Sequence, residues 1–117
     1  MSQWDIDFYE KPNGRCPTKD FLDSLPAGER VVVNNSISQL QEHGTGLDRP
    51  HTGYLRDHIH ELRIRVRRSR YRILYFFYHA DTIVLLQGIS KKSNRVPDRE
   101  IDRAIEYKRD YESTHNH

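Results

Sequence analysis

Residues 62–77 read LRIRVRRSRYRILYFF, a stretch that combines strong strand formers with a high density of positive charge. In its first half, apolar residues alternate with arginines, which is the two-residue period of a strand with one buried face. A turn at Arg68 and Ser69 returns the chain as a second strand over residues 71–78. The stretch therefore predicts a β-hairpin carrying six arginines, at positions 63, 65, 67, 68, 70 and 72.

The segment before the hairpin predicts one strand and two helices. Residues 3–9, QWDIDFY, alternate apolar and polar side chains as a strand does. Pro17 opens a short helix with apolar residues at helical spacing, and a second helix runs from Pro26 to about His43. Gly44 ends it, and residues 44–54 are predicted to form a loop.

After the hairpin, residues 82–90, TIVLLQGIS, predict the third strand of a meander. Pro97 opens a last helix with an apolar stripe that includes Ile101, Ala104 and Ile105. The order is β-α-α-β-β-β-α, which predicts an α+β fold: a small antiparallel sheet with two N-terminal helices and one C-terminal helix. At 117 residues and 14.0 kDa, we expect one domain spanning residues 1–117.

Composition narrows the class of protein. Only 35% of the residues are hydrophobic, the mean hydropathy is −0.90, and no apolar run has the length of a membrane span. The N-terminus lacks a signal-peptide pattern, and Cys16 is the only cysteine, so we expect a soluble cytoplasmic protein with no membrane partner. The net charge of +2 is too small to mark a nucleic-acid binder, so the positions of the charged residues along the chain have to be considered instead.

The predicted hairpin gathers its arginines on one face. With the turn at Arg68 and Ser69, Arg65 lies opposite Arg72 and Arg67 opposite Arg70, while Arg63 shares their face. Like charges directly opposite each other cost about 0.2–1 kcal/mol per pair unless an anion lies over them. A solvated face with Glu61 as counter-ion is the alternative, but five arginines favour an anion-binding face. Because guanidinium binds phosphodiesters bidentately, nucleic acid is the leading ligand.

Other residues can extend this surface. Lys91 and Lys92 leave the end of the next strand and could reach the same rim. Tyr71, Tyr75 and Tyr78 either offer stacking surfaces to bases or pack in the core, and the sequence leaves both open.

Several motifs together resemble the RelE/ParE superfamily of bacterial toxins, and most closely its phage-type HigB-like branch. They are the element order, ELR at residues 61–63, YRILY at residues 71–75, KK at residues 91–92, and the P-x-x-E-I-x-x-A pattern that begins at Pro97. The resemblance spans nearly the whole chain and implies a RelE-like fold.

The resemblance implies a ribosome-associated mRNA interferase that needs no metal and no cofactor. In such enzymes the ribose 2′-hydroxyl attacks the adjacent phosphate, leaving a 2′,3′-cyclic phosphate and a 5′-hydroxyl. By position, Arg72 would bind the scissile phosphate and Lys92 would assist the leaving oxygen. The resemblance makes the implied catalytic set Arg63, Arg65, Arg72 and Lys92, with Arg67, Arg70 and Lys91 as further RNA-binding residues.

The sequence departs from the RelE pattern in three places. Arg65 stands where those enzymes have a lysine proposed as general base, and guanidinium is a poor base. The substrate-orienting tyrosine has no clear counterpart, so Tyr107 and Tyr111 are only candidates. His60 stands at an aromatic position and could act as acid or base, although alternation places it on the packed face with Leu62.

The resemblance also implies a partner, a cognate antitoxin of HigA-like, helix-turn-helix type, alongside mRNA and the ribosome. Two alternatives to the endoribonuclease remain open: a ParE-type toxin that inhibits DNA gyrase without cutting RNA, and a plain RNA- or ribosome-binding module. The seven histidines form no metal-ligand motif, so no metal site is predicted.

Overall fold

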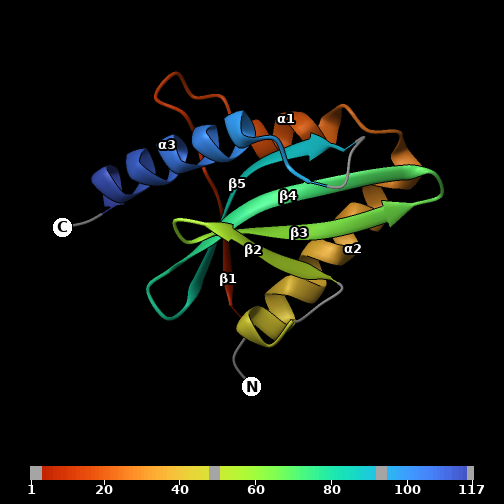
Figure 1. The fold of residues 1–117 in the computed structure, drawn as a ribbon, viewed down its shortest axis with the longest axis horizontal. Helices are drawn as coiled ribbons and strands as arrows, with labels where there is room; N and C mark the ends of the chain where they lie inside the picture. Colours follow the sequence, from red (N-terminus) through yellow and green to blue (C-terminus); the bar gives the residue numbers. More distant parts are fainter. Residues whose placement is uncertain (1–3, 48–50, 92–94, 116–117) are drawn as a thin grey trace.

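The computed structural model describes residues 4–47, 51–91 and 95–115. Its elements follow one another along the chain as β1 (Asp5–Phe8), α1 (Pro17–Asp23), α2 (Ala27–His43), the short 3₁₀ helix η1 (Gly44–Gly46), β2 (Thr52–Arg56), β3 (Ile59–Val66), β4 (Ser69–Tyr78), β5 (Thr82–Ser90) and α3 (Asp98–His115) (Figure 1). The α+β class, both N-terminal helices, the meander and the C-terminal helix are confirmed, in a RelE-like topology.

The sheet has five strands in the order β1-β5-β4-β3-β2, which corrects two predictions. β1 pairs with β5 in parallel, so the sheet is mostly rather than wholly antiparallel. β2 lies where a loop was predicted to run to Tyr54. Its five residues, TGYLR, include a glycine, and its pairing with β3 shifts register between Tyr54 and Arg56. A strand this short and irregular gives no two-residue period to detect.

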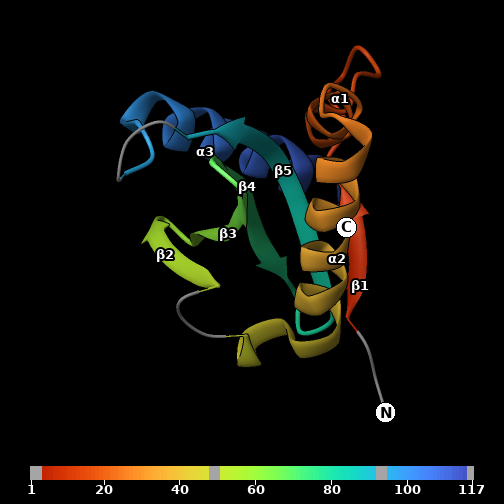
Figure 2. The same cartoon turned by 90° about the vertical axis from the view of Figure 1, so that its right-hand side faces the viewer.

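Helices cover both faces of the sheet (Figure 2). Buried residues of α2, including Val33, Ile37 and Leu40, pack with Leu62 and Ile64 of β3 on one face. On the other face, residues of α3 pack against the strands. That second cluster includes Leu74, Phe76, Val84, Leu86, Ile101, Ala104 and Ile105. Double coverage explains why β4 and β5 read as nearly continuous apolar runs.

The register of the β3–β4 hairpin differs from the prediction. Arg67 and Arg68 form the turn, Val66 pairs with Ser69, and the arginine pairs are Arg63–Arg72 and Arg65–Arg70. The predicted pairs, Arg65–Arg72 and Arg67–Arg70, are therefore wrong. Both registers keep the same residues on the same faces, so alternation could not separate them. The backbone at the turn decides, with a positive φ of 56° at Arg67.

The end of α2 depends on a glycine, which gives a first prediction. Gly44 has φ of 52°, and a Cβ there would lie 1.9 Å from Nε1 of Trp4. Gly44→Ala should therefore lower the free energy of unfolding by about 1–3 kcal/mol, through overpacking and a strained backbone. Urea unfolding followed by circular dichroism measures the change. Gly46→Ala is the control, because nothing lies within 4 Å of its Cβ position. Equal effects of the two substitutions would contradict the assignment.

Candidate functional site

Four arginines face the same side of the β3–β4 hairpin. Arg63 and Arg65 of β3 lie directly opposite Arg72 and Arg70 of β4, and we call these four residues the arginine face. All four line a hollow of about 370 Å³, together with His51 and Ile64. In Figure 1 the tip of the hairpin extends past the start of α3. The structure thus brings Arg63, Arg65, Arg70 and Arg72 together as the sequence predicts.

A buried carboxylate holds two of these arginines. Glu61 is only 5% exposed; its Oε2 lies 3.0 Å from Nη2 of Arg63 and its Oε1 accepts a hydrogen bond of 3.1 Å from Nε of Arg72. In the solvated-face alternative, Glu61 was a local counter-ion exposed to water. The structure shows instead a carboxylate that fixes the direction of two guanidinium groups.

The neighbouring strand leaves room for this cluster because it has a glycine at the right position. Gly53 of β2 pairs with Glu61 across the sheet. A Cβ at Gly53 would lie 2.5 Å from Nη2 of Arg63 and 2.8 Å from Oε2 of Glu61. The missing side chain therefore provides the space in which the Glu61–Arg63 ion pair sits.

Of the two arginines that pair with Glu61, Arg72 is the more enclosed. Its side chain is 11% exposed, against 35% for Arg63. Burial lowers the pKa of Arg72, opposed by the carboxylate of Glu61, and guanidinium stays charged at any physiological pH. Nε donates to Glu61 and Nη1 to the carbonyl of Tyr71. Within the described part of the chain the other N–H groups have no such partner, so they can bind an anion.

Lys91 adds an amine beside the arginines. It follows the last residue of β5, and its backbone N–H donates to the carbonyl of Arg70 at 2.8 Å. The residue is only 9% exposed. Burial lowers the pKa of the Lys91 amine, the positive charge of Arg72 lowers it further, and Glu61 acts in the opposite direction. Lys92, predicted to assist the leaving oxygen, lies outside the described residues.

The remaining candidates lie elsewhere. Arg67 is exposed in the hairpin turn, close in sequence to the arginine face but outside its strand pairs. His60 is on the opposite face, as alternation predicts, where its ring stacks on Tyr75 at 5.4 Å and contacts Tyr54 and Phe77 edge-on. Burial lowers the pKa of His60, and its position separates it from the arginine face.

Core packing accounts for two of the three tyrosines proposed as stacking surfaces, while the third, Tyr78, is part-buried against Tyr111 and His115. Tyr71 and Tyr75 are 5% and 1% exposed, and the hydroxyl of Tyr71 donates to Glu29. The stacking alternative is therefore wrong for both. Tyr111 donates to Asp7 within the cluster beneath α3, and Tyr107 stacks on Tyr9. Neither lines a hollow beside the arginine face.

Two residues of the surroundings were missed by the sequence reasoning. His51 lines the hollow of the arginine face and accepts a backbone hydrogen bond from Arg63. Arg95, before α3, lines a second hollow of about 320 Å³ that also includes Glu61 and Arg63. The basic run from Lys91 to Arg95 was the available signal for Arg95. His51 lay in the predicted loop and gave none.

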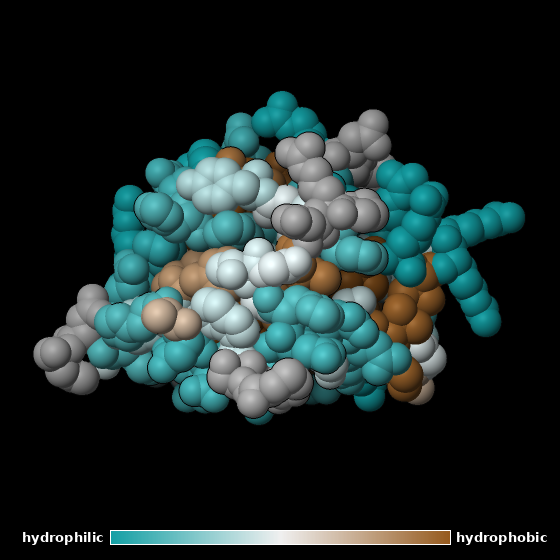
Figure 3. Space-filling view, turned by 90° about the horizontal axis from the view of Figure 1, so that it is seen from below, coloured by the Kyte–Doolittle hydropathy of each residue, from teal (hydrophilic) through white to brown (hydrophobic). Residues whose placement is uncertain are grey.

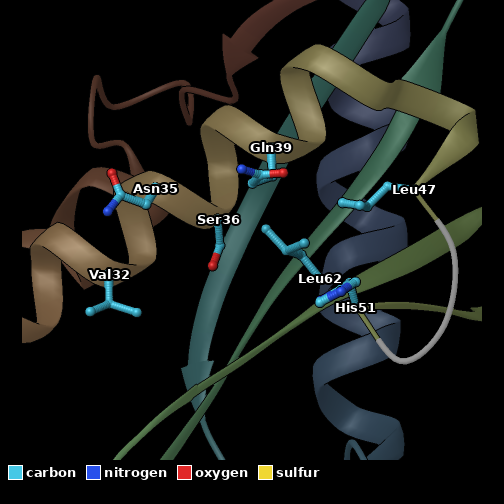
Figure 4. Close-up of a pocket in the computed structure, with 7 residues that line it drawn as sticks. All are labelled: Val32, Asn35, Ser36, Gln39, Leu47, His51 and Leu62. Atoms are coloured by element: carbon cyan, nitrogen blue, oxygen red, sulfur yellow. The ribbon is translucent and has the colours of Figure 1, made fainter.

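A further hollow lies between α2 and β3, on the other side of the sheet (Figure 4). Its volume is about 220 Å³, and His51 is the one titratable residue among those that line it. Figure 3 shows areas of hydrophobic surface set among hydrophilic side chains on the lower side of the molecule. Two large hydrophobic residues, Val31 and Tyr54, are 59% exposed, and neither belongs to the arginine face.

The part of the chain that the structure describes contains neither a metal-binding cluster nor a helix that could span a membrane. No group of three or more His, Cys, Asp and Glu side chains is arranged to hold a metal ion in residues 4–47, 51–91 and 95–115. Over the same residues, the helices lack the combination of length and apolar character that a membrane span requires.

The buried carboxylate gives a second prediction. Glu61→Gln keeps the shape of the side chain but leaves the enclosed Arg72 without its counter-charge, so the free energy of unfolding should fall by about 3 kcal/mol. Inorganic phosphate should restore part of it, because an anion that binds only the folded state stabilises that state. Urea unfolding with and without phosphate measures both effects.

The matched control is Glu42→Gln, an exposed glutamate of α2, which should change stability by less than about 0.5 kcal/mol. If Glu61→Gln behaves like Glu42→Gln, the carboxylate does not hold the arginines as described.

Comparison with known proteins identifies the family of the chain. No curated protein matches the chain in sequence. A family model, described as phage derived protein Gp49-like (DUF891), matches residues 20–109, a span that includes the arginine face, Glu61 and Lys91. The chain belongs to the phage-derived Gp49-like family, which is part of the RelE/ParE-like toxin superfamily and is HigB-like.

Proposed function

We propose that this protein is the toxin of a type II toxin–antitoxin pair, an endoribonuclease that cleaves translated mRNA on the ribosome. The observation that carries the proposal is the arginine face, in which Glu61 fixes Arg72 and Arg63 beside an open hollow. Family membership supports the toxin class. The guanidinium groups would bind the phosphodiester backbone bidentately.

The proposed reaction is an internal transfer at phosphorus. The ribose 2′-oxygen loses its proton and forms a bond to the adjacent phosphorus, and the bond from phosphorus to the 5′-oxygen breaks. The products are a 2′,3′-cyclic phosphate and a 5′-hydroxyl. Negative charge builds up on the phosphoryl oxygens in the transition state, so preorganised cations are the main catalytic device.

The arginines divide this work by position. Arg72, enclosed and aimed by Glu61, would bind the scissile phosphate. Arg63 and Arg65 would align the flanking backbone and favour the 2′-oxyanion. Arg67, Arg70 and Lys91 would extend the RNA-binding surface, and Lys92 would assist the leaving 5′-oxygen. A cognate antitoxin of helix-turn-helix type is the proposed partner, which would neutralise the toxin by keeping RNA or the ribosome from this surface.

A third prediction tests the reaction. Arg72→Ala should reduce cleavage of a translated reporter mRNA by about 100- to 1,000-fold, because it removes a charge that stabilises the transition state. Primer extension locates the cuts, and analysis of the 3′ ends detects the cyclic phosphate. Arg109→Ala, an exposed arginine of α3, is the control and should cut like the wild type.

Circular dichroism of both variants shows whether the fold is intact. Growth arrest by the wild type without any cuts would reject the endoribonuclease and favour a gyrase-inhibiting toxin. Neither arrest nor cuts would leave a basic RNA-binding domain.

A fourth prediction separates charge from backbone strain at the hairpin turn. Arg67 holds a positive φ of 56°, which favours glycine, so Arg67→Gly should raise the free energy of unfolding by about 0.5–1 kcal/mol. The same change should weaken binding of single-stranded RNA and reduce the slope of log affinity against log salt by about 0.7. Fluorescence anisotropy at several salt concentrations measures the slope.

Arg68→Gly is the matched control, because Arg68 is also exposed in the turn but is not among the residues with positive φ. It should lose affinity similarly without gaining stability. Stabilisation of Arg67→Gly with unchanged RNA affinity would remove Arg67 from the RNA-binding surface.

A further inference from the structure

Lys91 lies on the same face of the sheet as the arginines, directly after the end of β5. Tyr71 pairs with Ser90 across β4 and β5, and one residue further on, the backbone N–H of Lys91 donates to the carbonyl of Arg70. This register puts the Lys91 side chain on the same face of the sheet as Arg70. Arg65, Arg70 and Lys91 therefore form one row across three neighbouring strands.

Most of the other groups described at this surface cannot readily take up a proton. Guanidinium stays protonated at any accessible pH, which excludes the four arginines of the face. Both carboxylate oxygens of Glu61 already accept from guanidinium groups. His60 lies on the opposite face, stacked on Tyr75. His51, exposed at the sheet edge, lines both the hollow of the arginine face and the hollow on the α2 side, where Figure 4 shows its ring beside Leu62, so it is the competing candidate.

We infer that Lys91 is the residue that accepts the proton of the attacking 2′-hydroxyl, a catalytic role rather than backbone binding alone. The inference rests on the proposed endoribonuclease function. An amine is the one kind of cation in this surface that can lose its proton while still close to the charges that bind the phosphate. The residue is only 9% exposed, so most of its side chain is shielded from bulk water.

The proposed step needs only the RNA, the Lys91 amine and water. The neutral amine of Lys91 takes the 2′-hydroxyl proton as the bond from the 2′-oxygen to phosphorus forms. The bond from phosphorus to the 5′-oxygen breaks with its electron pair on oxygen, and that oxygen takes a proton from water. Lys91 then returns its proton to water when the products leave.

The charged groups around Lys91 favour its neutral form. Arg72 and Arg70 of β4 and Arg63 of β3 face the amine with positive charge, and Glu61 of β3 faces it with negative charge. Burial and the three guanidiniums together lower the pKa of Lys91 in spite of Glu61. Because the neutral amine is the active form, the cleavage rate should rise about tenfold per pH unit and level off above that lowered pKa.

The test is single-turnover cleavage of a reporter mRNA on purified translating ribosomes between pH 6 and 9. Lys91→Ala and Lys91→Arg should each lose about 100- to 10,000-fold in rate, because a general base contributes that much. Added ethylamine should restore part of the rate to Lys91→Ala and none to Lys91→Arg. Lys91→Met fills the same space and covers the case in which Lys91→Ala unfolds. Lys19→Ala, an exposed lysine of α1, is the matched control.

A second readout needs no substrate. Nuclear magnetic resonance titration of the lysine side chains, with Lys91 assigned from Lys91→Arg, should show Lys91 losing its proton at a lower pH than lysine ordinarily does. Loss of the Lys91 proton at the ordinary pH for lysine would overturn the inference.

The outcomes separate this inference from the proposed function. Near-normal cleavage by Lys91→Ala, with Arg72→Ala inactive, would overturn the role of Lys91 and keep the endoribonuclease. A rise of rate with pH that persists in Lys91→Arg would also overturn it and point to His51 as the base. A wild type that cuts no RNA would reject both.

Discussion

The buried carboxylate of Glu61 is the interaction on which the rest of the site depends. Four guanidiniums paired across two strands repel one another, and a sheet tolerates this only with a counter-charge or a bound anion. Glu61 neutralises part of the charge and turns Arg63 and Arg72 toward it. Gly53 on the neighbouring strand gives the ion pair its space. The site is thus preorganised but still carries excess positive charge, as a phosphate-binding surface requires.

The helices determine where this surface can exist. α2 packs against one face of β3 and buries Leu62 and Ile64, which hold the strand in place. α3 packs on the other face, and the tip of the β3–β4 hairpin extends past the start of α3 (Figure 1). The same strand therefore presents packed aliphatic residues on one side and arginines on the other. Alternation along β3 turns a local sequence pattern into a rigid charged surface.

Local periodicity was sufficient to predict most of the fold. Strong two-residue and helical periods gave the hairpin, the meander and the helices, and they placed His60 on the packed face. Local periodicity could not predict three features of the fold. The hairpin register could not be separated from one shifted by two residues, because both put the same side chains on the same faces. β2 is too short and irregular to detect, and the parallel pairing of β1 is a long-range contact. The arginine cluster could be predicted because it is local, whereas the burial of Glu61 depends on β2 and could not.

Guanidinium and amine groups differ in one property that matters for the proposed reaction, which is how readily each loses its proton. Arginine keeps its charge when enclosed, so Arg72 could bind a phosphate although its side chain is only 11% exposed. That same property makes arginine unable to move a proton, and Arg65 stands where the resemblance to RelE-type enzymes would place a lysine. Lys91 reaches the same face from β5 instead, where the fixed charges of Arg63, Arg70 and Arg72 destabilise its protonated form. Under the proposed function, the same arginines that would bind the substrate also lower the pKa of the lysine that would deprotonate it.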